Sequence, residues 1–251
     1  MPNSQIINTG INPNGQQNQK QQPLANTQFK KLVQPLTGQI VLPTEYPDYS
    51  KPDYWNNRYL DERGQVFDWY LNFAQLKDII MPRLFDDKDA EILNIGCGNS
   101  EMSEKIYQEG YHYITNADFS TIVIEEMKER HSHLDDMDYV EMDITEPMDL
   151  LDSDSFTVIL DKGTLDCVAC SDQYSKNSKQ MIENIHRILA PGGSYICVSY
   201  ARPETRFVYL KESSLKWKVE VVRIQKKSSI ELMERIDQEQ YYYVYICTKN
   251  Y

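Results

Sequence analysis

A glycine-rich turn between an apolar segment and a helical pattern is the part of the sequence best suited to binding a ligand. The turn reads Gly96-Cys97-Gly98-Asn99-Ser100 and follows Ile92-Leu93-Asn94-Ile95. Glycine lets the backbone approach a ligand closely, and the helix that follows offers unpaired N–H groups. About 20 residues further on, Asp118 ends the next apolar segment, where its carboxylate can accept hydrogen bonds from both hydroxyls of a ribose. This combination is typical of a site for an adenosine cofactor.

The residue after the turn distinguishes between two kinds of adenosine cofactor. A dinucleotide site usually has a third glycine where this chain has Glu101, because the helix must pack closely beside a pyrophosphate. A negative charge there opposes the pyrophosphate. S-adenosylmethionine has no phosphate and carries a sulfonium and an ammonium group, so it tolerates acidic neighbours. The sequence therefore favours S-adenosylmethionine.

Acidic residues also end the next two apolar segments. Asp143 is placed to accept a hydrogen bond from an adenine amino group, while Ile144 packs on the ring. The following segment ends in Asp161-Lys162-Gly163-Thr164-Leu165-Asp166, beside the point where the strand order of an open α/β sheet reverses. Ligands of such sheets bind at this switch point. We therefore expect the chemistry to take place there.

The elements that must position these residues alternate between two kinds. Strand-like apolar runs are followed by helical patterns, which indicates a parallel sheet covered by helices. The expected strands are 91–96, 113–118, 139–142, 156–161 and 194–200, and the expected helices are 103–109, 122–131 and 180–189.

Two further patterns flank this alternation. Residues 71–84 predict an earlier helix that Pro82 disturbs near its end. Residues 217–224 and 241–248 predict a pair of strands that closes the sheet as an antiparallel edge, with a short helix at 230–236 between them. The fold class is thus α/β, with one doubly wound and mostly parallel sheet.

The chain resembles the methyltransferase-like proteins that include lysine methyltransferases of translation elongation factor 1A. The resemblance covers roughly residues 50–200, and two of its strings, Gly-Cys-Gly-Asn-Ser and Asp-Lys-Gly-Thr-Leu-Asp, are far more specific than a bare glycine loop. Its motifs are Tyr54-Trp55-x-x-Arg58-Tyr59, Asp68-Trp69-Tyr70, Gly96-Cys97-Gly98-Asn99-Ser100, Asp118-Phe119-Ser120, Met142-Asp143-Ile144 and Asp161-Lys162-Gly163-Thr164-Leu165-Asp166.

The resemblance implies a seven-stranded class I methyltransferase fold, which is Rossmann-like, with S-adenosyl-L-methionine as the cofactor. It implies an aromatic lid within residues 44–70, and a protein lysine as the acceptor, with elongation factor 1A as the favoured substrate. The residues that it assigns to cofactor binding are Trp55, Tyr59, Trp69, Gly96, Gly98, Asn99, Asp118, Phe119, Asp143, Ile144 and Lys162.

Methyl transfer from a sulfonium is an in-line displacement, so the protein chiefly aligns donor and acceptor and removes water. We expect Asp161, Lys162 and Asp166 to be the catalytic residues, with the two aspartates orienting an incoming ammonium. A lysine acceptor has an ordinary pKa of about 10.4 and must lose a proton, which desolvation favours.

The aromatic residues Tyr200, Tyr209 and Trp217 have two interpretations. They either wall a channel for the acceptor or pack in the core, and core packing is the favoured alternative. Cys167 and Cys170 lack the second cysteine pair or nearby histidine that a tetrahedral zinc site needs, so no metal is expected.

Two rival functions remain open. In the first, the acceptor of the methyl group is a small molecule or nucleic acid, and a basic rim on the C-terminal hairpin supports this function. In the second, the fold is a catalytically silent subunit of an assembly. The rim consists of Lys211, Lys216, Lys218, Arg223, Lys226 and Lys227.

The bulk properties limit the class of protein. A chain of 251 residues with 41% hydrophobic content forms one sizeable core, which we assign to a domain at 44–251. Residues 1–43 are rich in Asn and Gln and are predicted to be a disordered tail, which a partner could bind. We expect His131 and His133 to face solvent.

Charge and hydropathy bear on partners and location. The net charge of −12 makes nucleic acid an unlikely partner and suits either a basic partner or simple solubility. No apolar run is long enough to span a bilayer and no secretory signal is evident, so we expect a cytoplasmic protein without membrane contact.

Overall fold

The computed structural model describes residues 47–148, 151–170, 176–226 and 241–251. Within them, residues of the unit Pro47–Tyr251 build a seven-stranded sheet in the order β3-β2-β1-β4-β5-β7-β6. The predicted tail at 1–43, its possible partner and the predicted helix at 230–236 lie outside the described residues. The strands are β1 (Ile92–Ile95), β2 (Ile114–Asp118), β3 (Met137–Glu141), β4 (Phe156–Lys162), β5 (Leu189–Ser199), β6 (Trp217–Gln225) and β7 (Tyr241–Lys249).

The first five strands are parallel, and the last two close the sheet as an antiparallel hairpin, as predicted. Strand β1 pairs with β2 on one side and with β4 on the other, so the chain reverses its direction of winding between these two neighbours. The carboxyl ends of β1 and β4 lie side by side, because Ile95 is in register with Asp161. Ligands of doubly wound sheets bind at such a reversal.

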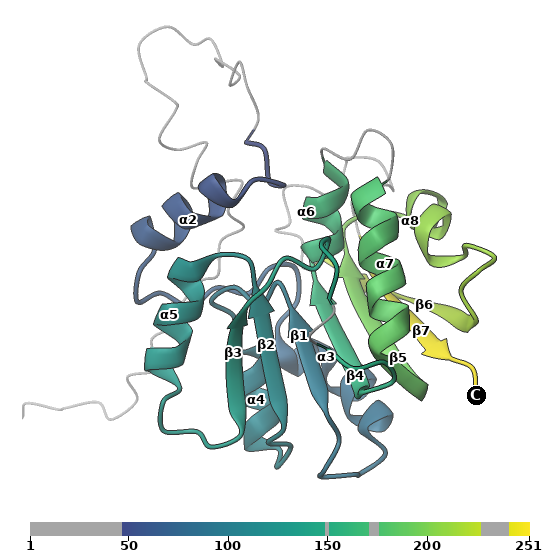
Figure 1. Cartoon of the computed structure of the whole chain (residues 1–251), viewed down its shortest axis with the longest axis horizontal. Helices are drawn as coiled ribbons and strands as arrows, with labels where there is room; N and C mark the ends of the chain where they lie inside the picture. The colour runs from purple at the N-terminus through teal and green to yellow at the C-terminus, as the bar shows by residue number, and fades with distance from the viewer. Residues whose placement is uncertain (1–46, 149–150, 171–175, 227–240) are drawn as a thin grey trace, which may run out of the picture. The chain divides into compact units, whose positions relative to one another are not determined.

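Each face of the sheet is covered by its own helices, as Figure 1 shows for α6, α7 and α8 in front of the strands and α3 and α4 behind them. Successive side chains of a strand point to opposite faces, so Ile92 packs on the face covered by α3 and α4, and Leu93 packs on the face covered by α6, α7 and α8. The helices are α2 (Pro52–Asp61), α3 (Phe73–Ile80), α4 (Met102–Gln108), α5 (Thr121–Arg130), α6 (Thr164–Cys170), α7 (Lys176–Ile188) and α8 (Pro203–Leu210).

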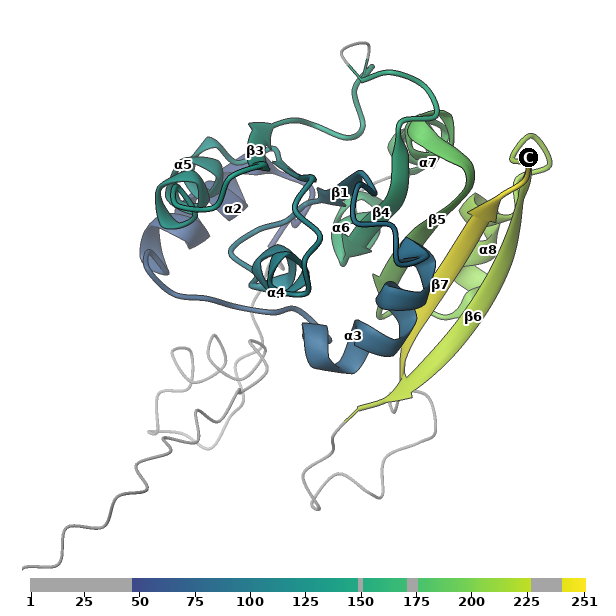
Figure 2. The same cartoon turned by 90° about the horizontal axis from the view of Figure 1, so that it is seen from below.

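The hairpin of β6 and β7 extends the sheet beyond β5, and α8 lies over the face of the sheet that α6 and α7 also cover (Figure 2). Trp217 and Tyr209 are each 9% exposed and belong to the core on this face. Core packing is therefore the correct interpretation for these two aromatics. Tyr200 differs from them, because it is 47% exposed.

The predicted helix at 71–84 is confirmed as α3 followed by a 3-10 turn, η1 (Met81–Leu84). Asn72 caps α3, since its side chain accepts a hydrogen bond from the Gln75 backbone N–H and the Gln75 side chain accepts one from the Asn72 N–H. Pro82 lies in η1, where the α-helical hydrogen-bond pattern has already ended.

Some elements differ from the prediction. Helices α2, α6 and α8 were not predicted, because each is short and two of them begin with a proline within the first turn. The expectation that His131 faces solvent is wrong, since only 4% of it is exposed and its Nδ1 lies 2.7 Å from the Tyr139 hydroxyl. The chain turns inward directly after α5, and this places the imidazole against β3.

Candidate active site

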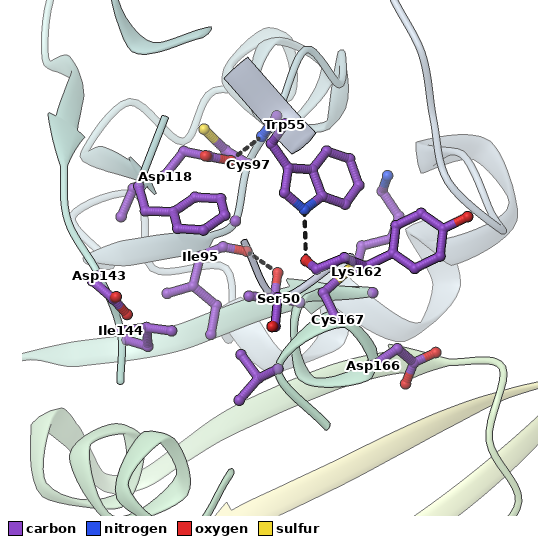
Figure 3. Close-up of a pocket in the computed structure, with 18 of the residues that line it drawn as sticks. Ser50, Trp55, Ile95, Cys97, Asp118, Asp143, Ile144, Lys162, Asp166 and Cys167 are labelled. Carbon is purple, nitrogen blue, oxygen red and sulfur yellow. Dashed lines mark hydrogen bonds between the residues drawn. The ribbon is translucent and has the colours of Figure 1, made fainter. Parts of the chain in front are cut away.

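A cavity of about 480 Å³ opens at the carboxyl ends of β1, β2 and β4, beneath α2 and the segment that follows it. Figure 3 shows Asp118, Asp143 and Ile144 on one side of this pocket and Lys162, Cys167 and Asp166 on the other. All but one of the predicted site residues line it: Trp55, Tyr59, Trp69, Gly96, Gly98, Asn99, Asp118, Phe119, Asp143, Ile144, Lys162 and Asp166. The exception is Asp161.

The glycine turn forms the floor of the pocket between β1 and α4. Gly96 has a φ of +56°, and a Cβ atom there would lie 2.0 Å from the Thr164 Oγ1. Gly98 has a φ of +52°, and its Cβ would lie 2.9 Å from the Tyr59 hydroxyl. Both positions need glycine because of backbone conformation and because the protein's own side chains occupy the space.

Asp118 lies at the end of β2 with its side chain 4% exposed at the pocket wall. Its two carboxylate oxygens accept hydrogen bonds from the backbone N–H groups of Gly98 and Ser120, each 3.0 Å long. Burial raises the pKa of Asp118 to about 6, although both N–H groups act in the opposite direction. Each oxygen keeps a further lone pair that is able to accept a hydrogen bond from a ligand.

The next strand end supplies a different surface. Ile144 is 7% exposed, and its backbone carbonyl accepts a hydrogen bond of 2.9 Å from the Asn184 side chain. Asp143 is exposed, and its Oδ1 accepts hydrogen bonds from the Thr145 N–H and hydroxyl. Together with the partly buried ring of Phe119, these residues form an apolar slot with one carboxylate at its rim.

Aromatic side chains close the pocket from the N-terminal side. The indole N–H of Trp55 donates a hydrogen bond of 2.7 Å to the Tyr49 carbonyl, and the Trp55 ring meets that of Trp69 edge-on at 5.9 Å. The Arg58 guanidinium lies over Trp55, Phe67 and Trp69, between 5.0 and 5.8 Å from their centroids. Cation–π contacts with Arg58 thus hold the aromatic rings of the predicted lid together.

Lys162 is held by an ion pair rather than left free in the cavity. Its Nζ lies 3.1 Å from the Asp68 Oδ1, which also accepts a hydrogen bond from the Ser100 hydroxyl. Burial lowers the pKa of Lys162, and the neighbouring Asp68 raises it in part. The pair fastens the lid segment to β4 and to the glycine turn.

The structure separates the two predicted catalytic aspartates. Asp161 is 1% exposed, and its carboxylate accepts hydrogen bonds from the Tyr195 hydroxyl at 2.7 Å and from the first backbone N–H groups of α6. Burial raises the pKa of Asp161 to about 6. Its geometry is that of a helix cap, and it does not reach the pocket surface.

Asp166 does line the pocket, yet both of its oxygens are engaged by protein donors. The Tyr70 hydroxyl and the Tyr200 N–H bind one oxygen at 2.9 and 2.8 Å. The Arg206 guanidinium, at 2.8 Å, and the Ser199 hydroxyl bind the other. This carboxylate holds neighbouring groups in place and is not free to bind an incoming cation.

Sequence reasoning missed three residues that build the site. Two of them, Asp68 and Tyr70, stand in the motif Asp68-Trp69-Tyr70, so the sequence carries a signal for both, although it does not indicate their roles. Arg206 lies on α8, 40 positions from its partner Asp166, and no spacing in the sequence connects the two.

The pocket is suited to an organic cation better than to a phosphate. Among the described residues, the lining acids Asp118, Asp143 and Glu146 form no ion pair. The lining also carries the exposed Lys51 and Lys162, which is paired with Asp68. In the described ranges no group of His, Cys, Asp and Glu side chains could hold a metal ion. Among those same residues, no helix has the length and apolar character needed to cross a bilayer.

Comparison with known proteins identifies the family. A family model described as "Methyltransferase domain" matches residues 86–246. An "EEF1A lysine methyltransferase 4" from Mus musculus is 31% identical over 192 residues, which cover 70% of this chain and 73% of that protein. Similarity to the "eEF1A lysine and N-terminal methyltransferase" of Bos taurus is 39% identity over 171 residues, or 64% of this chain. The match spans only 23% of the bovine protein.

A solved structure supports the fold independently. The N-methyltransferase NodS from Bradyrhizobium japonicum, in complex with S-adenosyl-L-homocysteine, superposes with a TM-score of 0.57 at 16% identity. The superposition covers 81% of this chain and 99% of that one. The chain therefore belongs to the methyltransferase domain family and has the class I fold of S-adenosylmethionine-dependent methyltransferases.

Proposed function

We propose that this protein transfers a methyl group from S-adenosyl-L-methionine to a lysine side chain of elongation factor 1A. One observation carries the proposal. The glycine turn, the ribose-type acid Asp118 and the adenine-type pair Asp143 and Ile144 face a single cavity beneath an aromatic lid. This is the order of contacts that the family resemblance implies.

The residues present fit such a donor. The cavity of about 480 Å³ lies within the range of roughly 300–1,000 Å³ that small-molecule sites occupy. Asp118 would accept the ribose hydroxyls, the slot at Ile144 would take the adenine, and the backbone at Gly96 would face the amino-acid part. The acidic lining suits a ligand with a sulfonium and an ammonium group.

When bound, the donor supplies an electrophilic methyl group on its sulfonium. The contribution of the chain is to orient the two reactants and to exclude water. Trp55 and Trp69 cover the cavity, and Gly163 leaves the switch point open, since it has a φ of +93° and no side chain. Asp166 and Arg206 act as positioning residues. Arg206 pairs with the Asp166 carboxylate at 2.8 Å, and this carboxylate holds Tyr70 and Tyr200 through hydrogen bonds.

The acceptor must arrive as a neutral amine. The ordinary pKa of a lysine is about 10.4, and transfer into an apolar enclosure lowers it because the charged form loses hydration. No described carboxylate of the pocket has to act as a base in this scheme, because solvent takes the proton before the amine is enclosed. We therefore keep Asp161 outside the catalytic group and assign it to the start of α6.

The choice of a protein lysine rests on the relatives. Their names give elongation factor 1A as the substrate of those proteins. The present chain spans about a quarter of the length of the first curated relatives, so the full set of activities named for them is not assumed. The cytoplasmic location expected from the sequence also stays a prediction.

The decisive experiment combines binding with transfer. Isothermal titration should give saturable binding of both S-adenosylmethionine and S-adenosylhomocysteine. Tritium from a labelled methyl group should then appear in purified elongation factor 1A, and mass spectrometry should locate it on one lysine. Substitution of that lysine by arginine should abolish the label. Donor binding without label in the factor would reject the substrate, and absence of donor binding would reject the whole proposal.

A further inference from the structure

A lysine of the chain itself lies between two tyrosine rings. The Nζ of Lys226 is 3.9 Å from the centroid of the Tyr200 ring and 4.8 Å from that of Tyr242. These are cation–π distances, and both rings contribute to holding one ammonium group. We refer to Tyr200 and Tyr242 as the tyrosine pair.

The strand register places the tyrosine pair at the active-site edge of the sheet. Ser199, the last residue of β5, is in register with Tyr243 of the antiparallel strand β7, so Tyr200, which follows β5, lies level with Tyr242 near the start of β7. Ile224 of β6 is in register with Tyr242, and Lys226 follows directly after this strand. The parallel strands β4 and β5 end at this edge, where the cavity opens.

Direct contacts connect the tyrosine pair to the pocket. The Tyr242 ring packs on that of Tyr70 at 5.2 Å, and Tyr70 lines the cavity beside Gly163. The Tyr70 hydroxyl and the Tyr200 N–H bind the same oxygen of Asp166. The carboxylate of Asp166 thus sets the positions of Tyr70 in the pocket and of Tyr200 in the pair.

The tyrosine pair has the properties of an entrance for a cationic side chain. Tyr200 is 47% exposed, so a group from another molecule is able to reach it. Two aromatic faces attract an ammonium on a flexible aliphatic stem through cation–π contact, and they oppose the loss of its proton less than a carboxylate would. A lysine entering the pocket has to give up that proton.

We propose that the tyrosine pair is the docking site for the acceptor lysine, and that Lys226 occupies this site in the free protein. The inference rests on the proposed function, because it concerns the path of a protein lysine into the same pocket. The chemical identity of the two groups makes Lys226 a competitor, so the acceptor has to displace it. Lys226 is then a specificity-determining residue, because amines that bind the tyrosine pair weakly cannot displace it.

Steady-state kinetics with the protein substrate tests the competition. Lys226→Ala should lower KM for that substrate about three- to tenfold, while kcat and the Kd of S-adenosylmethionine stay within about twofold. Lys218→Ala is the matched control, since Lys218 is an exposed lysine of the same hairpin paired with Glu220, and it should leave KM unchanged. An unchanged or higher KM in Lys226→Ala would overturn the inference.

The rings are tested with a conservative pair of variants. Tyr200→Phe keeps the aromatic face and should retain the wild-type KM, whereas Tyr200→Leu should raise KM about three- to tenfold at constant donor affinity. Equal KM values in the two variants would contradict a role for the ring.

A binding measurement separates this inference from the proposed function. With ¹³C-labelled tyrosine, n-butylammonium should shift the ring signals of Tyr200 and Tyr242 at lower concentration in Lys226→Ala than in the wild type. This result would support the docking site even if no protein lysine were methylated, in which case only the proposed function fails. Absence of any shift in Lys226→Ala would reject the docking site, whatever the transfer assay gives.

Discussion

Replacing Asp118 by asparagine separates the folding role of this carboxylate from its binding role. Burial raises the pKa of Asp118 from 3.8 to about 6, and at 1.36 kcal/mol per pH unit the buried charge costs about 3 kcal/mol at neutral pH. Asp118→Asn removes this cost. The amide NH₂ then faces one of the N–H groups of Gly98 and Ser120, which leaves a donor unsatisfied at about 1–3 kcal/mol. The free energy of unfolding should therefore change by less than about 2 kcal/mol.

The affinity for the donor should change much more than the stability. A hydrogen bond to a charged group contributes about 1.5–3 kcal/mol, and the asparagine carbonyl replaces at most one of the two carboxylate acceptors with a neutral one. Loss of one such bond raises the Kd of S-adenosylmethionine about 10- to 150-fold.

Urea denaturation and isothermal titration measure the two effects. Asp138→Asn is the matched control, since it makes the same change of charge on an exposed residue of β3 that does not line the cavity. It should leave both the stability and the Kd unchanged. Equal donor affinity in Asp118→Asn and in the wild type, with both proteins folded by circular dichroism, would refute the assignment of Asp118 to the ribose.

The same reasoning fixes the pH dependence. The folded-state pKa of Asp118 lies above its unfolded value, so this group makes the protein less stable as the pH rises from about 4 to about 6. Donor binding needs the ionised carboxylate, so affinity should fall as the pH drops below about 6. Both dependences should be weaker in Asp118→Asn, and an unaltered affinity profile would contradict the role of this group.

Three further changes test the architecture around the pocket. Gly96→Ala brings a Cβ within 2.0 Å of the Thr164 Oγ1 at a φ of +56°, so it should destabilise the fold by more than about 2 kcal/mol, and adding Thr164→Ala should restore part of this in urea denaturation. Arg206→Met leaves the charge of Asp166 without its partner and should cost about 3–5 kcal/mol, whereas a loss below about 1 kcal/mol would show that the pair is dispensable. Trp55→Phe keeps a ring but removes the indole hydrogen bond of 2.7 Å from a buried side chain, so titration should give a severalfold weaker donor affinity and the melting temperature should fall by about 2–4 °C.

The order and type of the central elements could be predicted because their signals are local. Apolar runs bounded by glycine or aspartate mark β1, β2 and β4, and the predicted bounds agree with the structure to within one or two residues. Helix α8 was not predicted, because Phe207 and Val208 give only a weak amphipathic pattern over its eight residues. Strand β5 begins at Leu189, earlier than expected, since its pairing with β4 continues past a register shift through a proline and glycine segment.

The site was predictable where one strand end provides one contact. Asp118 and Ile144 line the cavity because Asp118 ends β2 and Ile144 lies in the short segment that follows the end of β3. What could not be predicted is which acids are already satisfied. Asp161 and Asp166 stand in one six-residue string, but the first meets Tyr195 of β5 and the second meets Arg206 of α8. Such pairings depend on sheet order and helix placement, which the spacing within the string does not encode.

The contact at Gly96 has a consequence for reading related sequences. Any descendant that keeps Thr164 packed under the turn between β1 and α4 must also keep glycine at this position, whether or not it retains a ligand. Selection for folding alone would therefore preserve Gly96 in a protein that no longer catalyses a reaction. After such a loss, exposed side chains with only local contacts are the freest to change, and Asp143 is one of them, because its hydrogen bonds are to Thr145, two residues further on. Its replacement in a relative would be an earlier sign of lost activity than any change among the glycines.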